Sequence, residues 1–305
     1  MMAFVKPDPA ASTIELAEVP APRMDDGELL VRLVAVGVGI HDSYFLPSEA
    51  TYPFTIGIEG AGIVVDVGRD IDRYHPGDRI AFVSSMQAKG GTWAEYAVVD
   101  ARSLILPMPA ELDFVLAAAL PVAGNTALRA LSALEAIPEG GSIFVAGGSG
   151  AIGTLIIQLA HRKGWRVAAS ASTPNHDYMR SLGAHLTVDY RNRRWPDEVR
   201  GWAPSGVDAA IAIQPDTTRD SMLVVKDRGG VITVSGDAAT PERGIHLGMI
   251  DYEKDVRGEL VDLMTDVVTR DVHLEIERTY AFQQAAEALA RVQTRHVRGK
   301  LVLRM

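Results

Sequence analysis

The spacing of hydrophobic residues divides the chain at about residue 115. Before that point, short apolar runs at 29–36, 62–67 and 79–83 are separated by turns rich in Gly, Pro and Asp. Such runs are typical of strands, so the first part of the chain is predicted to be β-rich. The segments 114–120 and 123–134 are rich in Ala and Leu and are predicted to be helices.

Strand and helix patterns alternate in the second half of the chain. We expect strands at 142–146, 166–170, 207–213 and 230–234, helices at 151–163 and 175–182, and then a helix at 282–291 and a strand at 300–303. Strands that alternate with helices form right-handed crossovers, so this order predicts a parallel sheet. The fold class expected here is α/β, with a doubly wound sheet following a β-rich unit.

A glycine-rich turn lies between the predicted strand 142–146 and the predicted helix 151–163. Its residues Gly148, Ser149, Gly150, Ala151, Ile152 and Gly153 read G-x-G-x-x-G. This motif between a strand and a helix is typical of dinucleotide sites, where backbone N–H groups and the helix N-terminus bind the diphosphate. A packing turn without a ligand is the alternative.

The end of the predicted strand 166–170 indicates which dinucleotide is bound. An acidic residue there is typical of NAD sites, but Ser172 and Thr173 stand here, and the first carboxylate is Asp177. Small hydroxyl residues do not repel a 2′-phosphate, so NADPH is the predicted cofactor. His176 and Tyr190 are candidate donors to that phosphate, although His176 fits an exposed helix position equally well.

Length and composition exclude several classes of protein. At roughly 150 residues per domain, 305 residues predict two domains. A net charge of −9 is unlike that of a general nucleic-acid binder. The absence of Cys excludes disulfides, thiolate nucleophiles and Cys-bound metals, and it fits a cytoplasmic location. Neither a signal peptide nor a membrane span is predicted, so we expect a small-molecule partner and no membrane or nucleic acid.

Several further motifs occur in a fixed order along the chain. They are GIEGAG at 57–62, PGDRI at 76–80, GTWAEY at 91–96, LPVAGNTA at 120–127 and GKLVL at 299–303. Together with the glycine-rich turn they resemble the zinc-independent quinone oxidoreductases of the medium-chain dehydrogenase/reductase superfamily. The resemblance covers nearly the whole chain.

This resemblance implies a particular division of the chain. Residues 1–118 plus 242–305 are expected to form a β-rich, GroES-like catalytic domain, and residues 119–241 a Rossmann domain that binds NADP. The resemblance places Thr126 near the nicotinamide and adds Lys300 to the cofactor-binding residues. It also implies a homodimer.

The resemblance also bears on metal and catalytic residues. Zinc-dependent relatives carry ligands at positions that look like Gly39 and Ile58 here, and neither residue binds a metal, so no metal is expected. Many zinc-independent relatives have Asn at the position of Gly39. Tyr44 and His41 are therefore the candidate catalytic residues, with packing or structural roles as the alternative for each.

The predicted reaction is hydride transfer from NADPH to a quinone or an α,β-unsaturated carbonyl compound. Two other functions stay open. One is a dedicated enoyl or carbonyl reductase of a biosynthetic pathway, and the other is a non-catalytic NADPH-binding sensor. The sequence does not identify the physiological substrate or the stereochemistry of transfer.

Overall fold

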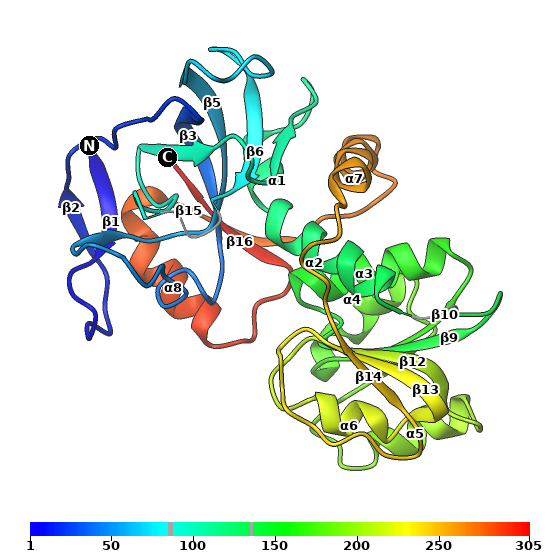
Figure 1. Cartoon of the computed structure of the whole chain (residues 1–305). Helices are drawn as coiled ribbons and strands as arrows, with labels where there is room; N and C mark the ends of the chain where they lie inside the picture. The colour runs from blue at the N-terminus through cyan, green and yellow to red at the C-terminus, as the bar shows by residue number, and fades with distance from the viewer. Residues whose placement is uncertain (85–87, 135–136) are drawn as a thin grey trace. The chain divides into compact units, whose positions relative to one another are not determined.

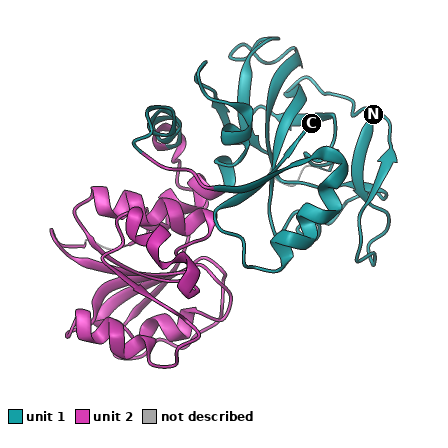
Figure 2. Cartoon of the chain, turned by 180° about the vertical axis from the view of Figure 1, so that it is seen from behind, with its two compact units in different colours: residues 1–122, 260–271, 276–305 teal, residues 123–259, 272–275 magenta. Residues whose placement is uncertain are grey.

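The computed structural model describes residues 1–84, 88–134 and 137–305. The chain forms two compact units (Figure 2). Unit 1 comprises residues 1–122, 260–271 and 276–305, and unit 2 comprises residues 123–259 and 272–275.

Unit 1 contains two sheets (Figure 1). The smaller has the order β2-β1-β4, and the larger has the order β15-β16-β3-β5-β6-β8, with β7 also paired to β3. The strands are β1 (Met2–Lys6), β2 (Glu15–Glu18), β3 (Glu28–Val38), β4 (Phe54–Thr55), β5 (Glu59–Val67), β6 (Arg79–Val83), β7 (Tyr96–Asp100), β8 (Ile105–Pro107), β15 (Ile276–Ala281) and β16 (Lys300–Arg304).

Strand β3 is the centre of the larger sheet. Exposed or half-buried residues alternate with buried ones along its first half, and its last four residues are all buried. The strand therefore has one covered face at its start and two at its end. It pairs antiparallel with β5, β7 and β16, so a strand from near residue 300 is placed beside one from near residue 35.

Helices of unit 1 are short apart from α7 and α8. They are α1 (Phe114–Ala118), η2 (Phe282–Gln284), α8 (Ala285–Gln293) and most of α7 (Arg257–Thr269). The carboxylate of Asp113 accepts the N–H of Val115 at 2.8 Å and so caps the start of α1. Helix α7 buries Leu260, Leu263, Met264 and Val267, which lie on one helical face.

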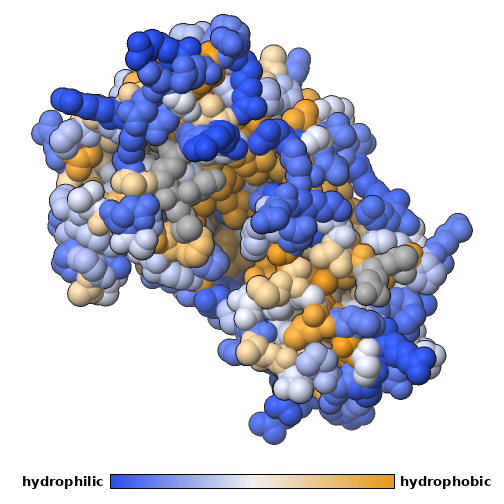
Figure 3. Space-filling model, viewed as in Figure 1, coloured by the Kyte–Doolittle hydropathy of each residue, from blue (hydrophilic) through white to orange (hydrophobic). Residues whose placement is uncertain are grey.

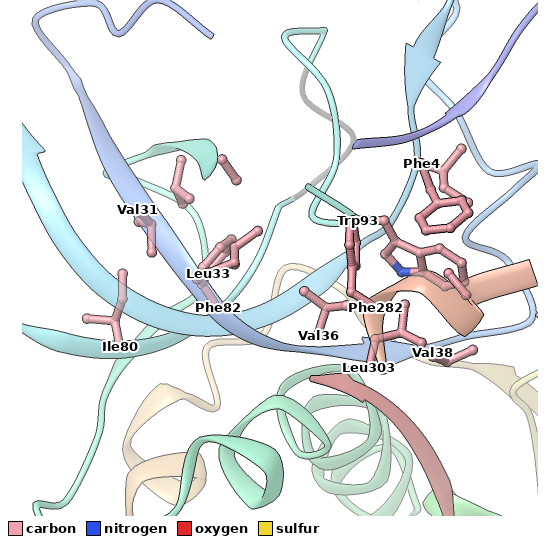
Figure 4. Packing of buried hydrophobic residues seen from close by; sticks show 14 of the residues in the cluster. Phe4, Val31, Leu33, Val36, Val38, Ile80, Phe82, Trp93, Phe282 and Leu303 are labelled. Atoms are coloured by element: carbon pink, nitrogen blue, oxygen red, sulfur yellow. The ribbon is translucent and has the colours of Figure 1, made fainter. Parts of the chain in front are cut away.

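The core of unit 1 is built on aromatic residues from distant parts of the chain (Figure 4). The ring of Phe4 meets Trp93 edge-on at 6.5 Å and Phe282 edge-on at 5.1 Å between centroids. Trp93 is fully buried. Burial of side chains of this size stabilises the fold by about 1.5–3 kcal/mol each. Because Phe4 and Phe282 come from opposite ends of the chain, their contact joins the N-terminal strand to the C-terminal part of the unit.

Unit 2 is a doubly wound parallel sheet with the order β11-β10-β9-β12-β13-β14. Its strands are β9 (Ser142–Ala146), β10 (Arg166–Ser170), β11 (Leu186–Val188), β12 (Val207–Ala212), β13 (Val225–Thr233) and β14 (His246–Met249). Strand order reverses between β9 and β12, and ligands of such sheets bind at the carboxyl ends of the strands beside this point. The α/β fold class expected from the sequence is confirmed.

Helices cover both faces of this sheet. They are α2 (Pro121–Ser132), α3 (Ala151–Arg162), η1 (Thr173–Asn175), α4 (His176–Ser181), α5 (Trp195–Trp202) and α6 (Thr218–Met222). Figure 1 shows α3 and α4 on one face and α5 and α6 on the other. Beneath α5, the ring of Trp195 stacks on Phe144 of β9 with centroids 4.9 Å apart, which fixes that helix against the central strand.

Hydrophilic side chains make up most of the face shown in Figure 3, with apolar atoms exposed among them. Over the described residues the large apolar side chains that reach the surface are Met2, Leu16, Tyr44, Phe45, Val65, Tyr190, Leu223, Met249 and Tyr252. In the part of the chain that the structure describes, no helix combines the length and the apolar character needed to cross a membrane.

Candidate active site

The glycine-rich turn is hydrogen-bonded to the end of β10. Gly147 adopts a φ of +96°, a conformation that glycine tolerates without strain. The N–H groups of Gly147 and Gly148 both donate to the carbonyl of Ser170, at 3.2 and 2.9 Å. The turn therefore has a fixed position at the carboxyl ends of β9 and β10.

Glycine stands at positions 153 and 150 of the turn for two different physical reasons. A Cβ on Gly153 would lie 2.3 Å from the carbonyl oxygen of Gly147, so this position requires glycine for helix α3 to approach the turn. A Cβ on Gly150 would meet only that same oxygen at 3.8 Å, so its outer side is open. Gly150 is also the N-cap of α3 and offers no side-chain acceptor.

The start of α3 fits a pyrophosphate. The first-turn N–H groups of a helix have no partner within the helix, and here no side chain caps them. An open face at Gly150 leaves these donors accessible, and the helix dipole favours a negative charge there. The residues from Gly148 to Gly153 that the sequence predicts to bind a cofactor are thus brought together at one helix end.

A carboxylate that the sequence analysis missed lies beside this turn. Asp189 directly follows β11, and the pairing of Ser170 with Val188 brings it next to the end of β10. Its Oδ2 accepts the backbone N–H of Thr173 at 3.1 Å and the hydroxyl of Thr173 at 2.6 Å. Strand β11 has only three residues, so the sequence contains no apolar run that would predict a strand ending just before Asp189.

Arg191 neutralises this carboxylate. Its guanidinium donates to Asp189 Oδ1 at 2.9 Å and to Oδ2 at 2.6 Å. These bonds, together with the donors of Thr173, hold the pKa of Asp189 well below its usual range. The carboxylate is therefore ionised and paired, and its charge is balanced beside the end of β10.

The other predicted phosphate donors surround the same strand end. Ser172 Oγ accepts from Asn175 Nδ2 at 3.1 Å, and His176 Nε2 lies 3.3 Å from the carbonyl of Ala171. His176 is half-buried, whereas Tyr190 is 49% exposed. The hydroxyls of Ser172 and Thr173 therefore have different partners, Asn175 and Asp189, while His176 lies against the backbone and Tyr190 is at the surface.

Helix α2 carries Thr126, whose side chain is buried. Its neighbour Asn125 accepts the Nε of Arg129 at 2.8 Å, and Arg129 donates to the carbonyl of Asp251 at 2.5 Å. Asn125 therefore positions an arginine that ties α2 to the segment after β14.

In unit 1, an exposed aromatic group follows the end of β3. The N–H groups of Tyr44 and Phe45 donate to the carbonyl of His41, which forms a tight turn. The ring of His41 lies 5.3 Å from that of Tyr44 and 6.2 Å from that of Phe45. Tyr44 and Phe45 are each 53% exposed, so the turn presents two aromatic rings and one phenol hydroxyl at the surface.

Buried ionisable groups lie in the same part of unit 1. Asp42 is 1% exposed and accepts the N–H of Gly39 at 2.7 Å, while Glu59 forms an ion pair with Lys300. Burial raises the pKa of Asp42 to about 7, against the opposing effect of the Gly39 N–H. Partial desolvation, followed by the charges of Arg295 and Lys300, lowers the pKa of His41.

Lys300 was predicted from its motif, whereas Asp42 and Glu59 were not predicted. The available signal was an acidic residue within the otherwise apolar, glycine-rich segment 57–62. A charge in such a strand is buried and needs a partner. Within the described ranges, no three His, Asp or Glu side chains are grouped closely enough to hold a metal ion.

Comparison with known proteins gives consistent matches. The family described as alcohol dehydrogenase GroES-like domain matches residues 25–110, and the family described as zinc-binding dehydrogenase matches residues 182–303. The NADPH-dependent alkenal/one oxidoreductase, chloroplastic, of Arabidopsis thaliana is 31% identical over 299 residues, which cover 94% of this chain and 74% of that protein.

Two further comparisons agree. The quinone-oxidoreductase QR1, chloroplastic, of Triphysaria versicolor is 27% identical over 321 residues and spans 96% of this chain and 94% of that protein. The solved quinone oxidoreductase from Coxiella burnetii has a TM-score of 0.89 and 26% sequence identity, and the match covers 100% of this chain and 99% of that one.

Proposed function

Because this chain is an oxidoreductase of the quinone oxidoreductase type within the medium-chain dehydrogenase/reductase superfamily, we propose that it transfers hydride from NADPH to a quinone or an α,β-unsaturated carbonyl compound without zinc. The observation that carries this proposal is the open, uncapped start of α3 beneath the glycine-rich turn. This helix start lies at the carboxyl ends of the strands, which is the position at which parallel sheets bind the diphosphate of a dinucleotide.

The residues at the end of β10 support NADPH rather than NADH. Ser172 and Thr173 carry hydroxyls at the end of β10, where we propose that the ribose binds. The carboxylate oxygens of Asp189 already accept hydrogen bonds from Thr173 and Arg191. A carboxylate held in this way has few free acceptor sites for ribose hydroxyls. Arg191 and the exposed Tyr190 are the nearby donors that can reach a 2′-phosphate, with His176 as a further candidate.

Residues outside the glycine turn have separate proposed roles. When bound, NADPH supplies the hydride. Tyr44 donates a hydrogen bond to the carbonyl oxygen of the acceptor, and His41 donates the proton that, with the hydride, completes reduction of the acceptor. The exposed rings of Tyr44 and Phe45 suit a planar apolar acceptor, and Thr126 is proposed to contact the nicotinamide.

The donor set supports the proposed independence from zinc. Gly39 and Ile58 occupy the two positions where zinc-dependent relatives are expected to carry ligands, and the chain has no Cys. Dialysis of the enzyme against a chelator should therefore leave the rate of NADPH oxidation unchanged. A loss of activity that added zinc restores would contradict this part of the proposal.

The proposal is tested by following NADPH oxidation with a panel of quinones and enones. We expect turnover with members of both classes and a lower kcat for Tyr44→Phe by about tenfold, the effect of one neutral hydrogen bond. Tyr252→Phe is the matched control, since it removes a hydroxyl from another exposed tyrosine. Binding of NADPH without turnover on any acceptor would favour a non-catalytic sensor instead.

A further inference from the structure

One ion pair of unit 1 is built across a strand. Leu301 of β16 lies opposite Val38 on one side of β3, and Gly60 of β5 lies opposite Val36 on the other. Lys300 and Glu59 each precede these partners by one residue, so they approach β3 from its two sides. Their side chains meet over the end of this strand, with 8% and 2% of each exposed.

Gly37 makes this crossing possible. A Cβ on Gly37 would lie 2.6 Å from Oε1 of Glu59 and 2.6 Å from the carbonyl oxygen of Ala118. Both distances are too short for real contacts, so any side chain here would displace the carboxylate. The glycine therefore leaves the space in which Glu59 reaches Lys300.

Both carboxylate oxygens of Glu59 are engaged. Oε1 contacts the ammonium of Lys300, and Oε2 accepts the N–H of Val122 in the first turn of α2 at 2.7 Å. The hydroxyl of Thr92 also donates to the Glu59 carbonyl at 2.9 Å. Glu59 thus connects β5, β16 and the start of α2 through one buried side chain.

The ammonium of Lys300 retains donors for a ligand. An ammonium has three N–H groups, and over the described residues Glu59 is the one acceptor that its side chain contacts. Two donors therefore remain on a buried cation at the end of β3, the strand that leads into His41 and Tyr44.

We infer that Glu59 is a positioning residue, which holds the Lys300 ammonium so that its remaining N–H groups donate to a carbonyl oxygen of the bound nicotinamide or of the acceptor. The inference rests on the proposed reductase function. Glu59 itself touches neither ligand, and it acts by direction and charge, since an ammonium buried without a counter-charge is costly.

Electrostatic effects on neighbouring groups agree with this placement. Lys300 contributes to the lowered pKa of His41 and opposes the raised pKa of Asp42. The positive charge of Lys300 therefore reaches the aromatic turn that the proposed function assigns to the acceptor. The other charged groups that act on this turn are Arg295, which contributes to the lowered pKa of His41, and Glu59, which contributes to the raised pKa of Asp42.

Glu59→Gln tests the inference through the pH dependence of catalysis. The amide NH₂ of Gln faces a donor at either Lys300 or Val122, and the ammonium loses its counter-charge. The ammonium is then buried without its counter-charge, so kcat/KM should fall more at alkaline pH than at neutral pH, relative to wild type. A variant that loses activity equally at every pH would overturn the inference.

Two readouts separate the two sources of the ligand oxygen. A higher KM for NADPH in Glu59→Gln identifies the nicotinamide, whereas a lower kcat with an unchanged KM for NADPH identifies the acceptor carbonyl. If Glu59→Gln does not fold, Lys300→Gln takes its place and should change the same parameter. Wild-type kinetics in Lys300→Gln would overturn the inference.

A matched control and the wild type complete the design. Glu277→Gln breaks the Glu277–Arg291 ion pair of the same unit and should keep the wild-type pH profile. A wild type without NADPH oxidation would overturn the proposed function and this inference with it. An active wild type whose pH profile matches that of Glu59→Gln would overturn the inference alone.

Discussion

At the scale of single residues, glycines and carboxylates define what the site can bind. Gly37 and Gly153 are required because a Cβ would collide with a carbonyl oxygen at 2.6 and 2.3 Å. Gly150 has space on its outer side, so its lack of a side chain serves a ligand rather than the fold. These differences separate substitutions that break the structure from those that change binding.

Gly150→Asp should abolish NADPH binding while the protein stays folded. Asp is a favoured N-cap residue, and the φ of −78° at Gly150 suits any L-residue, so stability should be equal or slightly higher. The carboxylate would repel the pyrophosphate from the first-turn N–H groups. Calorimetry with NADPH and a thermal melt measure the two effects. Gly150→Asn, without the charge, is the matched control, and tight NADPH binding by Gly150→Asp would refute the phosphate loop.

Arg191→Gln should reduce the preference for NADPH over NADH. The substitution removes a donor for the 2′-phosphate and leaves the charge of Asp189 unpaired beside Thr173. A charge-assisted hydrogen bond contributes about 1.5–3 kcal/mol, so the ratio of the two dissociation constants should change by at least about tenfold. Both constants are measured by titration. An unchanged ratio would assign Arg191 to the fold of its loop.

At the scale of elements, the sequence predicts those strands and helices that have a long apolar run or are bounded by a glycine-rich turn. The strand and helix expected at 142–146 and 151–163 correspond to β9 and α3, and the helix pair near residue 120 corresponds to α1 and α2. Strand β11, of three residues, and β14, with Gly248 in its middle, have no pattern of their own. They form because the neighbouring strand offers hydrogen-bonding partners, which sequence periodicity does not reveal.

The candidate site follows the same division. Residues within one motif, such as Gly148 to Gly153, are predicted together because their spacing along the chain is their spacing in the turn. Asp189 and Glu59 are not predicted as site residues, because they reach Thr173 and Lys300 only through the pairing of strands that are distant in the sequence. A single sequence has no signal for which strand will lie beside which.

The turn after β3 should make stability depend on pH through Asp42. Its pKa is raised to about 7 in the folded protein from 3.8, so the folded state favours the protonated form. The free energy of unfolding therefore loses a contribution as the pH rises from about 4 to about 7. Asp42→Asn should gain stability relative to wild type across this window, as measured by urea denaturation.

A second carboxyl provides the opposite sign. Arg102 lowers the pKa of Asp100, so the folded state favours its ionised form. Asp100→Asn should lose stability relative to wild type as the pH rises toward about 4, and the deficit should then stay constant at higher pH, because the contribution of a lowered pKa is complete above the unfolded value of 3.8. If the difference between Asp42→Asn and wild type is constant with pH, the burial of an ionisable carboxyl at this turn is wrong.

At the scale of the whole molecule, a short segment determines how the chain is divided. Residues 272–275 belong to unit 2, although α7 before them and β15 after them lie largely in unit 1. Gln158 of α3 holds this segment, because its side chain donates to the carbonyl of His273 at 2.9 Å and accepts the His273 N–H at 2.7 Å. The side-chain amide of Gln158 thus makes the two backbone hydrogen bonds that a neighbouring strand would otherwise make with His273.

We propose that the homodimer implied by the family resemblance forms through the open edge of the unit 2 sheet. Strand β14 is the last strand of that sheet and contains no Lys, Arg, Asp or Glu, and its Met249 is 67% exposed. An uncharged edge with an exposed apolar residue readily pairs with another strand. Edge strand β2 of unit 1 is different, because Glu15 and Glu18 stand at its two ends.

Met249→Lys should therefore convert a dimer to a monomer. Met249 is the last residue of β14, and a lysine there would place a charge against the paired edge in each copy, where it would lose water without gaining a partner. Light scattering gives the mass of each variant, and we expect twice the chain mass for wild type and one chain mass for Met249→Lys. Leu16→Lys, which places the same charge on β2, should remain dimeric. A monomeric wild type, or a Met249→Lys variant that stays dimeric, would show that β14 does not form the interface.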